Sequence, residues 1–256
     1  MKFIENPPQL NTKYLFVLFF LGFFSIYFSS TAQTILLQED VIADTMPILT
    51  GPNMKNYTHT YSGYGFLLGN SEGKGAEIKP GISNEFIFGV RYKRRICNFY
   101  SLGFNVYYSS LNFQFKQDSS KIFPNPVLHD KEKLAYNNAG IELYNRINFG
   151  KRGNIIGNFF DFGGYGEWGF NIRHYYRDNF SVAIAGASAV EVKNRGLLYT
   201  NKVNYGAAVR VGINRYVIYG KYRFSDLFNK GYLEKTGLTY PELPRLILGL
   251  EIGLFK

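Results

Sequence analysis

The side chains best suited to acid–base or nucleophilic chemistry are three histidines, His59, His129 and His174. His174, at the outer end of the strand expected at 157–173, has a carboxylate and a hydroxyl close by in the sequence, Asp178 and Ser181. A nucleophilic site needs a nucleophile, a base and an orienting group in mutual contact, and no motif around His174 fixes such a contact. We therefore expect that the protein is not an enzyme and that His174 is a polar residue near a membrane interface.

Metal and cofactor chemistry is equally poorly represented. Cys97 is the single cysteine, which excludes an intramolecular disulfide and a thiolate metal cluster. No group of His, Asp and Glu residues has metal-ligand spacing, and Gly63-x-Gly65 lacks the following helix that a nucleotide-binding loop requires. We expect no catalytic residue, no metal site and no cofactor.

Most of the remaining chemistry belongs to charged residues that share one parity with glycines and small polar residues. Side chains of a strand alternate between its two faces, so such residues lie together on one face. Charges enclosed on that face must be paired and hydrogen-bonded to be tolerated. We therefore expect a structural network of salt bridges. Its predicted members are Glu85, Arg91, Glu142, Arg146, Asp161, Glu167, Arg173, Arg210 and Glu251.

The elements that position these residues are strands with a two-residue period. In the clearest segment, 157–173, Phe162 and Trp168 occupy one parity while Asp161 and Glu167 occupy the other. Repeated segments of this kind predict an all-β fold, an antiparallel transmembrane β-barrel of about eight strands. The strands are expected at 58–70, 81–93, 99–111, 135–149, 157–173, 201–213, 216–224 and 245–255.

Residue bulk indicates which face of the strands points outward. An eight-stranded lumen is only just wide enough to be filled by side chains. The apolar parity carries too many large residues to fit there, among them Phe88, Leu143 and Leu250, whereas the other parity carries glycines such as Gly89 and Gly249. We predict that the apolar face meets lipid and that charged side chains fill the lumen, which leaves no open pore.

The connections between the predicted strands alternate in length. Three short links, 94–98, 150–156 and 214–215, alternate with four long ones, 71–80, 112–134, 174–200 and 225–244. Bacterial outer-membrane barrels have short periplasmic turns and long extracellular loops. The alternation predicts a protein of the cell outer membrane with both termini in the periplasm.

The loop 174–200 is the most unusual connection because residues 182–190 are small and mostly apolar. We expect it to extend the barrel as a hairpin closed near residues 194–196. Binding residues concentrate on loops held by a rigid scaffold. A protein partner at the extracellular loops is therefore left open, with the hairpin edge as its site.

The N-terminal region has the order of an export signal. Lys2 and Lys13 flank a polar opening, an apolar run covers residues 15–28, and small residues precede Gln33. We predict a cleaved signal peptide at residues 1–32, a periplasmic leader at 33–57 and the outer-membrane β-barrel at 58–256.

The chain is basic, with a formal net charge of +10 at pH 7. The cations are spread over strands and loops, so we expect no nucleic-acid partner; outer-membrane lipid and lipopolysaccharide are the expected partners. Tyrosines near strand ends are typical of the membrane–water interface. The predicted interface tyrosines are Tyr61, Tyr92, Tyr136, Tyr175 and Tyr176.

Residues 58–256 resemble the small outer-membrane β-barrel proteins of the Bacteroidota, of the PorT-like or OmpA-like eight-stranded class. The resemblance rests on the Ala32–Gln33 junction, on glycine-aromatic strands such as 86–92, and on the stretch 219–224. The final stretch, 248–255, is similar to the terminal strand read by the barrel-assembly machinery, which the resemblance implies as a partner during insertion. Phe255 falls on the lumen parity and departs from the usual terminal aromatic.

The function expected from these features is a structural, partner-binding or surface-interaction role for a barrel with a filled lumen. Three alternatives remain open. The resemblance to PorT-like proteins suggests an accessory component of a secretion machine. The others are an outer-membrane lipid-modifying enzyme and a narrow solute channel.

Overall fold

The computed structural model describes residues 51–150, 155–184 and 186–254. The predicted signal peptide, 1–32, and most of the predicted leader, 33–57, lie outside the described residues. Of the helices within the described residues, none is both long and apolar enough to cross a membrane.

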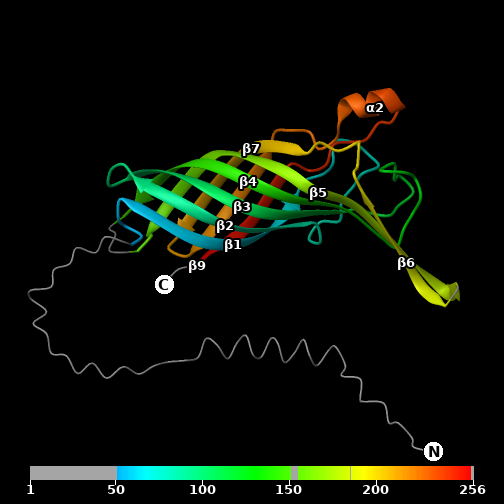
Figure 1. The fold of residues 1–256 in the computed structure, drawn as a ribbon, viewed down its shortest axis with the longest axis horizontal. Coiled ribbons are helices and arrows are strands. Elements are labelled where there is room, and N and C mark those ends of the chain that lie inside the picture. Colours follow the sequence, from blue (N-terminus) through cyan, green and yellow to red (C-terminus); the bar gives the residue numbers. More distant parts are fainter. Residues whose placement is uncertain (1–50, 151–154, 185, 255–256) are drawn as a thin grey trace, which may run out of the picture. The chain divides into compact units, whose positions relative to one another are not determined.

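Eight antiparallel strands close into a barrel (Figure 1). Seven pairings join strands that follow one another around the wall, and the pairing of β1 with β9 closes the circle. The prediction of an all-β, eight-stranded antiparallel barrel is thereby confirmed. The wall consists of β1 (Asn56–Leu68), β2 (Asn84–Arg95), β3 (Tyr100–Gln114), β4 (Lys131–Phe149), β5 (Asn158–Ile184), β7 (Val203–Ile213), β8 (Tyr216–Arg223) and β9 (Leu246–Leu254).

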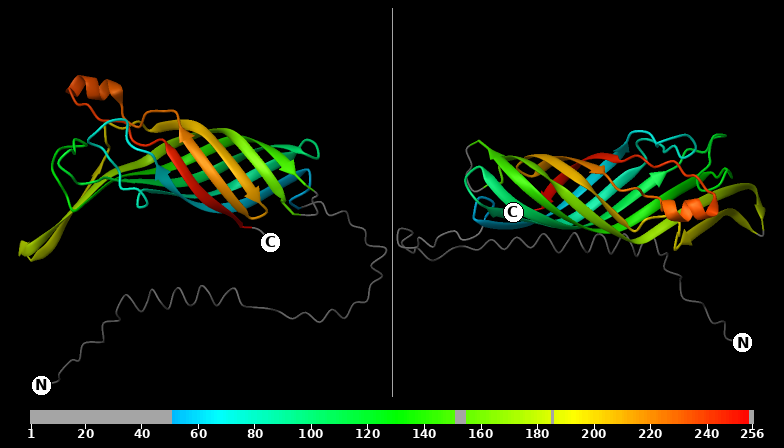
Figure 2. Two further views of the ribbon diagram at one scale, coloured as in Figure 1. Left: turned by 180° about the vertical axis from the view of Figure 1, so that it is seen from behind. Right: turned by 90° about the horizontal axis from the view of Figure 1, so that it is seen from above.

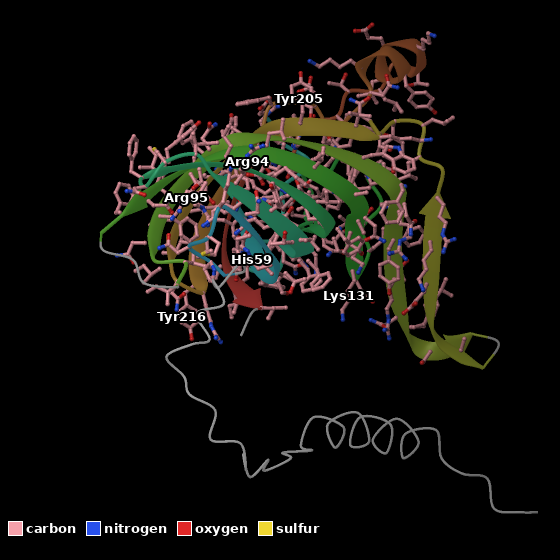
Figure 3. All side chains as sticks on the ribbon, turned by 60° about the vertical axis from the view of Figure 1, so that its left-hand side comes forward. His59, Arg94, Arg95, Lys131, Tyr205 and Tyr216 are labelled. Carbon is pink, nitrogen blue, oxygen red and sulfur yellow. The ribbon has the colours of Figure 1, made fainter. Side chains whose placement is uncertain are left out.

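The alternation of the strands places their apolar residues on the outside of the wall. Phe88, Leu143 and Leu250 are 46%, 67% and 63% exposed, whereas Glu85 and Asp161 are fully enclosed. Figure 3 shows side chains filling the bore, with Tyr205 on the outer surface. The prediction of the two faces is therefore confirmed, because the large side chains do not fit a bore of this width.

The two ends of the barrel differ. The short connections and the described ends of the chain lie at one end, and the long connections lie at the other (Figure 2). One long connection contains the short helix α2 (Lys230–Thr236), whose N-cap, Asn229, accepts a hydrogen bond from the Tyr232 amide. Gly237 ends α2 in the left-handed conformation that glycine adopts readily. We call the end with the long connections the loop end.

At the loop end, β5 runs on beyond the wall and pairs with β6 (Ala187–Arg195) as a hairpin. The hairpin predicted from the sequence is present, but its predicted closure near residues 194–196 is wrong. β5 instead ends at Ile184 and β6 begins at Ala187, Gly186 between them has a φ of +79°, and Gly196 follows the end of β6. Pairing between β5 and β6 extends to Ile184, which pairs with Ala187.

An aromatic core closes over the loop end of the bore. Phe123 is completely buried, and its ring centroid lies 4.9 Å from those of Phe228 and Tyr240 and 5.0 Å from that of Phe115. Tyr199 packs against the same ring at 5.7 Å. These five residues, which we call the aromatic cap, come from three different connections and bury apolar surface that each loop alone would expose.

Candidate functional site

A ring of five polar side chains occupies the middle of the bore. Arg91 donates from Nη2 to Glu251 at 2.8 Å and from Nε to the Asn105 amide oxygen at 2.9 Å. Arg210 donates to the other oxygen of Glu251 at 3.3 Å and to Glu142 at 2.6 Å. Asn105 completes the ring by donating to Glu142 at 3.0 Å. Two arginines thus balance two carboxylates, and we call this set the central ring.

A second cluster lies one layer nearer the loop end. The Lys221 ammonium is 2.7 Å from Glu85 and 2.6 Å from Glu167. The hydroxyls of Tyr219 and Tyr107 donate to Glu85 and Glu167 at 3.3 and 2.9 Å. This lysine cluster therefore holds two carboxylates on one cation, with tyrosines supplying part of the hydrogen bonding.

A third pair lies towards the opposite end of the bore. Arg146 binds Asp161 through two parallel hydrogen bonds of 2.7 Å, the bidentate geometry that suits a guanidinium and a carboxylate. The guanidinium carbon also lies 3.6 Å from the centre of the Phe159 ring. This contact adds a cation–π interaction to the ion pair.

Eight of the nine residues predicted for the lumen network lie in these three layers. The ninth, Arg173, lies elsewhere. The pairing of β4 with β5 shifts by one residue between Asn137 and Asn138, and this β-bulge reverses the faces of β5 beyond it. Ile172 and His174 are consequently buried, and Arg173 between them points away from the interior.

Aromatic rings fill the remaining space in the bore, opposite glycines. A methyl group on Gly140 would lie 2.4 Å from the Tyr107 ring, and one on Gly249 would lie 2.5 Å from the Tyr219 ring. The sequence predicts glycines on this face, but not the rings that need them. Tyr61 and Tyr136 were wrongly predicted as interface residues, since both are enclosed within the barrel. The sequence signal for such a ring is a glycine on one strand beside a lumen-parity tyrosine on the neighbouring strand.

The lumen is closely filled next to the lysine cluster. The hollow bordered by Glu167, Lys221 and Asn204 measures about 10 Å³. A single water molecule needs roughly 10 to 15 Å³ of such space. A bore packed to this degree has no room for a solute at that level.

His174 has a different partner from the one its sequence neighbours suggest. Its Nε2 lies 2.8 Å from Glu132, which also accepts from Lys121 at 2.6 Å and from Gln117 at 2.7 Å. His174 and Glu132 are both buried beside the aromatic cap. This arrangement joins β4, β5 and the connection 115–130 through one carboxylate.

Asp178 instead pairs with His129, at 2.8 Å from its Nδ1, and Tyr176 stacks on the His129 ring with centroids 4.1 Å apart. The side chain of Ser181 lies outside the described residues. His174 and Asp178 therefore have different ion-pair partners, Glu132 and His129. Within the described residues, no group of three or more His, Cys, Asp and Glu side chains has the geometry of a metal site.

The fold and the lumen define a class: a closed eight-stranded antiparallel barrel, consistent with the small barrels of outer membranes. No protein-family model matches the sequence, and comparison with curated proteins finds no match.

Proposed function

We propose that this protein is an outer-membrane barrel with a closed bore, whose role is structural and partner-binding and is carried by its loop end. The observation that carries the proposal is the inversion of the usual polarity of a soluble protein: apolar side chains cover the wall and ion pairs fill the interior. An exposed apolar surface of this extent marks contact with lipid or another apolar surface.

The height of the apolar surface supports a membrane location. On β5, outward-facing aromatic residues run from Phe160 to Phe170. Ten residue steps of about 3.4 Å, tilted by about 45°, give roughly 24 Å. The apolar band of outer-membrane barrels is about 25 Å tall.

The hairpin of β5 and β6 supports partner binding. β6 pairs with β5 along one edge, and the other edge carries no strand among the described residues. An unpaired edge presents backbone donors and acceptors that an added strand from another protein can bind. The hairpin projects beyond the barrel (Figure 1), so a partner can reach it. An accessory role in a secretion machine would use such an edge.

Fractionation tests the location. The mature protein is expected in the outer-membrane fraction and to run as a compact, heat-modifiable species on gels. Recovery in a soluble fraction would contradict the proposal.

Native pull-down from solubilised outer membranes tests the binding role. In the test variant, an Asn-Gly turn replaces residues 180–188 and joins Asn179 to Ala189, which are paired in the hairpin. A Leu128→Ser variant in another exposed loop is the matched control. A partner recovered with wild type and control, but not with the shortened hairpin, supports the proposal. Equal recovery with all three would locate the binding site elsewhere.

Lipid analysis of a deletion strain addresses the enzyme alternative. Unchanged lipid A acylation and phospholipid composition are expected. A change restored by wild type but not by His174→Ala would favour a lipid-modifying enzyme.

A further inference from the structure

The register shift in β5 creates an outward-facing polar surface directly above the apolar band. Before the shift, outward residues have even numbers, ending with Trp168 and Phe170. After it, Arg173 and Tyr175 face outward while His174 turns inward to Glu132. At the level where the apolar band stops, the outward-facing side chains of β5 therefore change from Trp168 and Phe170 to Arg173 and Tyr175.

Three neighbouring strands bring basic side chains to this surface. Arg173 pairs in register with Ala135 of β4 and with Arg195 of β6, and Tyr175 pairs with Lys133 and Lys193. We call the set the outer basic patch; six of its side chains are cationic and one, Glu191, is acidic, a formal surplus of five. The cations of the patch are Lys131, Lys133, Arg173, Arg177, Lys193 and Arg195.

The charges of the patch are only partly compensated within the protein. Glu191 lies 3.5 Å from Arg177 and 3.7 Å from Lys193, and all three side chains are well exposed. The Nε of Arg173 is buried and has no hydrogen-bond partner among the described residues. A buried donor without a partner costs free energy that a bound acceptor restores. The patch is therefore short of anionic acceptors.

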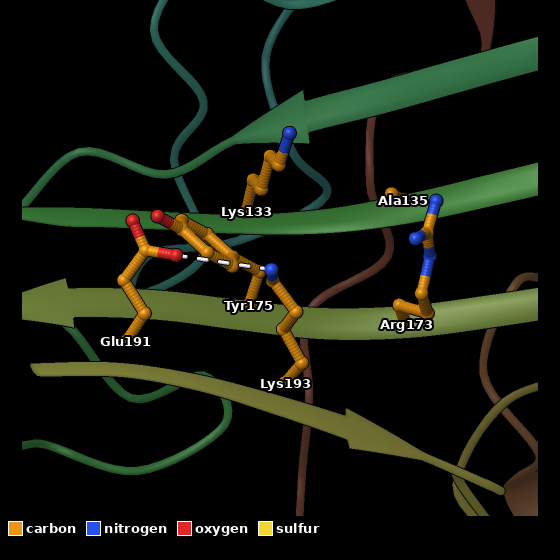
Figure 4. A pocket seen from close by; sticks show the side chains of 6 residues that line it. All are labelled: Lys133, Ala135, Arg173, Tyr175, Glu191 and Lys193. Atoms are coloured by element: carbon orange, nitrogen blue, oxygen red, sulfur yellow. Dashed lines mark ion pairs between the residues drawn. The ribbon is translucent and has the colours of Figure 1, made fainter. Parts of the chain in front are cut away.

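The surface is hollowed where these side chains meet. A hollow of about 340 Å³ is bordered by Lys133, Arg173, Tyr175, Glu191 and Lys193. Figure 4 shows these side chains on the same side of the strands, with Tyr175 between the basic groups. The ammonium groups of Lys133 and Lys193 lie 5.4 and 5.8 Å from the centre of the Tyr175 ring. The hollow is large enough for a phosphorylated sugar headgroup.

A second hollow connects the basic residues to the apolar band. It measures about 360 Å³ and is bordered by Phe170, Arg195 and Lys202. Phe170 also lies next to Tyr108 of β3, with ring centroids 6.3 Å apart. Cations thus stand immediately above aromatic rings that face outward, which matches a lipid with an anionic headgroup and acyl chains below it.

We propose that the outer basic patch binds the phosphate groups of an outer-leaflet lipid, with the acyl chains lying along Phe170 and Trp168. This inference rests on the proposed outer-membrane location. Arg173 supplies planar paired donors suited to phosphate, and the lysines supply point charges. The occupant is a phosphorylated glycolipid because phosphate complements the basic surplus and acyl chains complement the apolar band.

The test uses the mature protein refolded in a zwitterionic detergent and titrated with diphosphoryl lipid A, with its dephosphorylated form and with inorganic phosphate. The test variant combines Lys133→Gln, Arg173→Gln and Lys193→Gln. The control combines Lys74→Gln, Lys116→Gln and Lys235→Gln, which removes equal charge from exposed positions on other connections. Heat-modifiability verifies that each variant is folded.

Diphosphoryl lipid A is expected to bind wild type and control with affinities within twofold of each other, and the test variant at least tenfold more weakly. Arg173→Lys is expected to lose part of the affinity because it keeps the charge but not the paired donors. The dephosphorylated lipid is expected to bind all forms weakly. Equal affinity of the test variant, or of the dephosphorylated lipid, would overturn the proposal, as would inorganic phosphate binding as tightly as the lipid.

Failure of the site is distinguishable from failure of the membrane location. A protein that inserts into vesicles but binds lipid A without regard to the patch would contradict the lipid site alone. A folded protein that stays out of vesicles would contradict the proposed location itself.

Discussion

At the scale of residues, the lumen clusters differ in how they balance charge. The central ring matches Arg91 and Arg210 with Glu142 and Glu251. The lysine cluster has two carboxylates for Lys221 alone. Removing a carboxylate therefore has opposite effects in the two places: it leaves an uncompensated arginine in the ring, but a one-to-one ion pair in the lysine cluster.

Glu142→Gln is expected to destabilise the barrel by about 3 to 5 kcal/mol, the range found when one partner of a buried ion pair is removed. Glu85→Gln keeps similar volume and leaves Lys221 paired with Glu167, so its cost is expected to be clearly smaller. Urea titrations of unfolding in lipid vesicles compare the two variants. A Glu85→Gln protein less stable than Glu142→Gln would contradict this account of the lumen charges.

Outside the barrel wall, Asp226 belongs to an ion-pair cluster in which Arg245 links two connections at the loop end. It accepts from Lys230 at 2.7 Å and from Arg245 at 2.6 Å, and Arg245 also binds Glu72 at 2.7 Å. The hydrogen bonds from Lys230 and Arg245 hold the pKa of Asp226 below its ordinary value. A carboxyl group whose pKa is lower in the folded state stabilises that state above its unfolded pKa, and this contribution is lost as the pH falls through the folded pKa.

Arg245→Gln is expected to raise the pKa of Asp226 towards its ordinary value because one of the two donors loses its charge. The measurement is the pH titration of the carboxyl carbon of labelled aspartate by NMR. Lys74→Gln, also at the loop end, is the control and is expected to leave the midpoint unchanged. The same midpoint in wild type and Arg245→Gln would show that the contact does not stabilise the charged carboxylate.

At the scale of elements, the register of each strand follows from the difference between its two faces, of which one is apolar and the other polar or charged. One face of β9 carries Leu248, Leu250 and Ile252 on the outside, while Glu251 of the same strand belongs to the central ring. A slip of one residue would place every apolar side chain of the strand in the bore and every charge on the outer surface. The charged lumen therefore stabilises the register as well as filling the space.

Leu250→Arg places a charge on the outer face near the middle of the apolar band. This substitution is expected to cost about 2 to 4 kcal/mol of folding free energy in vesicles, the range for arginine at the bilayer midplane. Leu128→Arg makes the same change on an exposed connection at the loop end and is expected to have little effect. Equal stability of both variants in vesicles would contradict the assignment of the outer face to lipid.

At the scale of the whole barrel, three polar layers and an aromatic cap lie in series along the bore. Arg146 and Asp161 occupy one layer, the central ring the next and the lysine cluster the third. The aromatic cap around Phe123 follows at the loop end. A solute would have to displace several buried ion pairs to pass.

Wild-type protein in planar bilayers is therefore expected to show little steady conductance. Replacing Arg210 and Glu142 together by Ser removes two large side chains of opposite charge from the central ring. Arg91 stays paired with Glu251, so no charge in the ring loses its partner. This variant is expected to show at most brief openings of small conductance, because the other two polar layers still fill the bore. A stable, large conductance of the wild type that is insensitive to these residues would favour the channel alternative.

The sequence alone determined the strands, their number and which face of each points outward, because a period of two and the bulk of side chains are local properties. It also identified glutamates and arginines such as Glu142 and Arg210 as lumen residues. It did not determine which of them pair: β4 and β7 are not neighbours in the wall, and only closure brings these side chains together across the bore.

Tertiary structure alone decided the position of Arg173 and the partner of His174. A single-residue shift between β4 and β5 reversed the faces beyond it, and a two-residue period carries no mark of such a shift. The aromatic cap likewise depends on contacts between connections far apart in the chain, such as Phe123 with Tyr240. Strand alternation is fixed residue by residue, whereas pairing across a bore and packing between loops depend on the closed barrel that brings distant segments together.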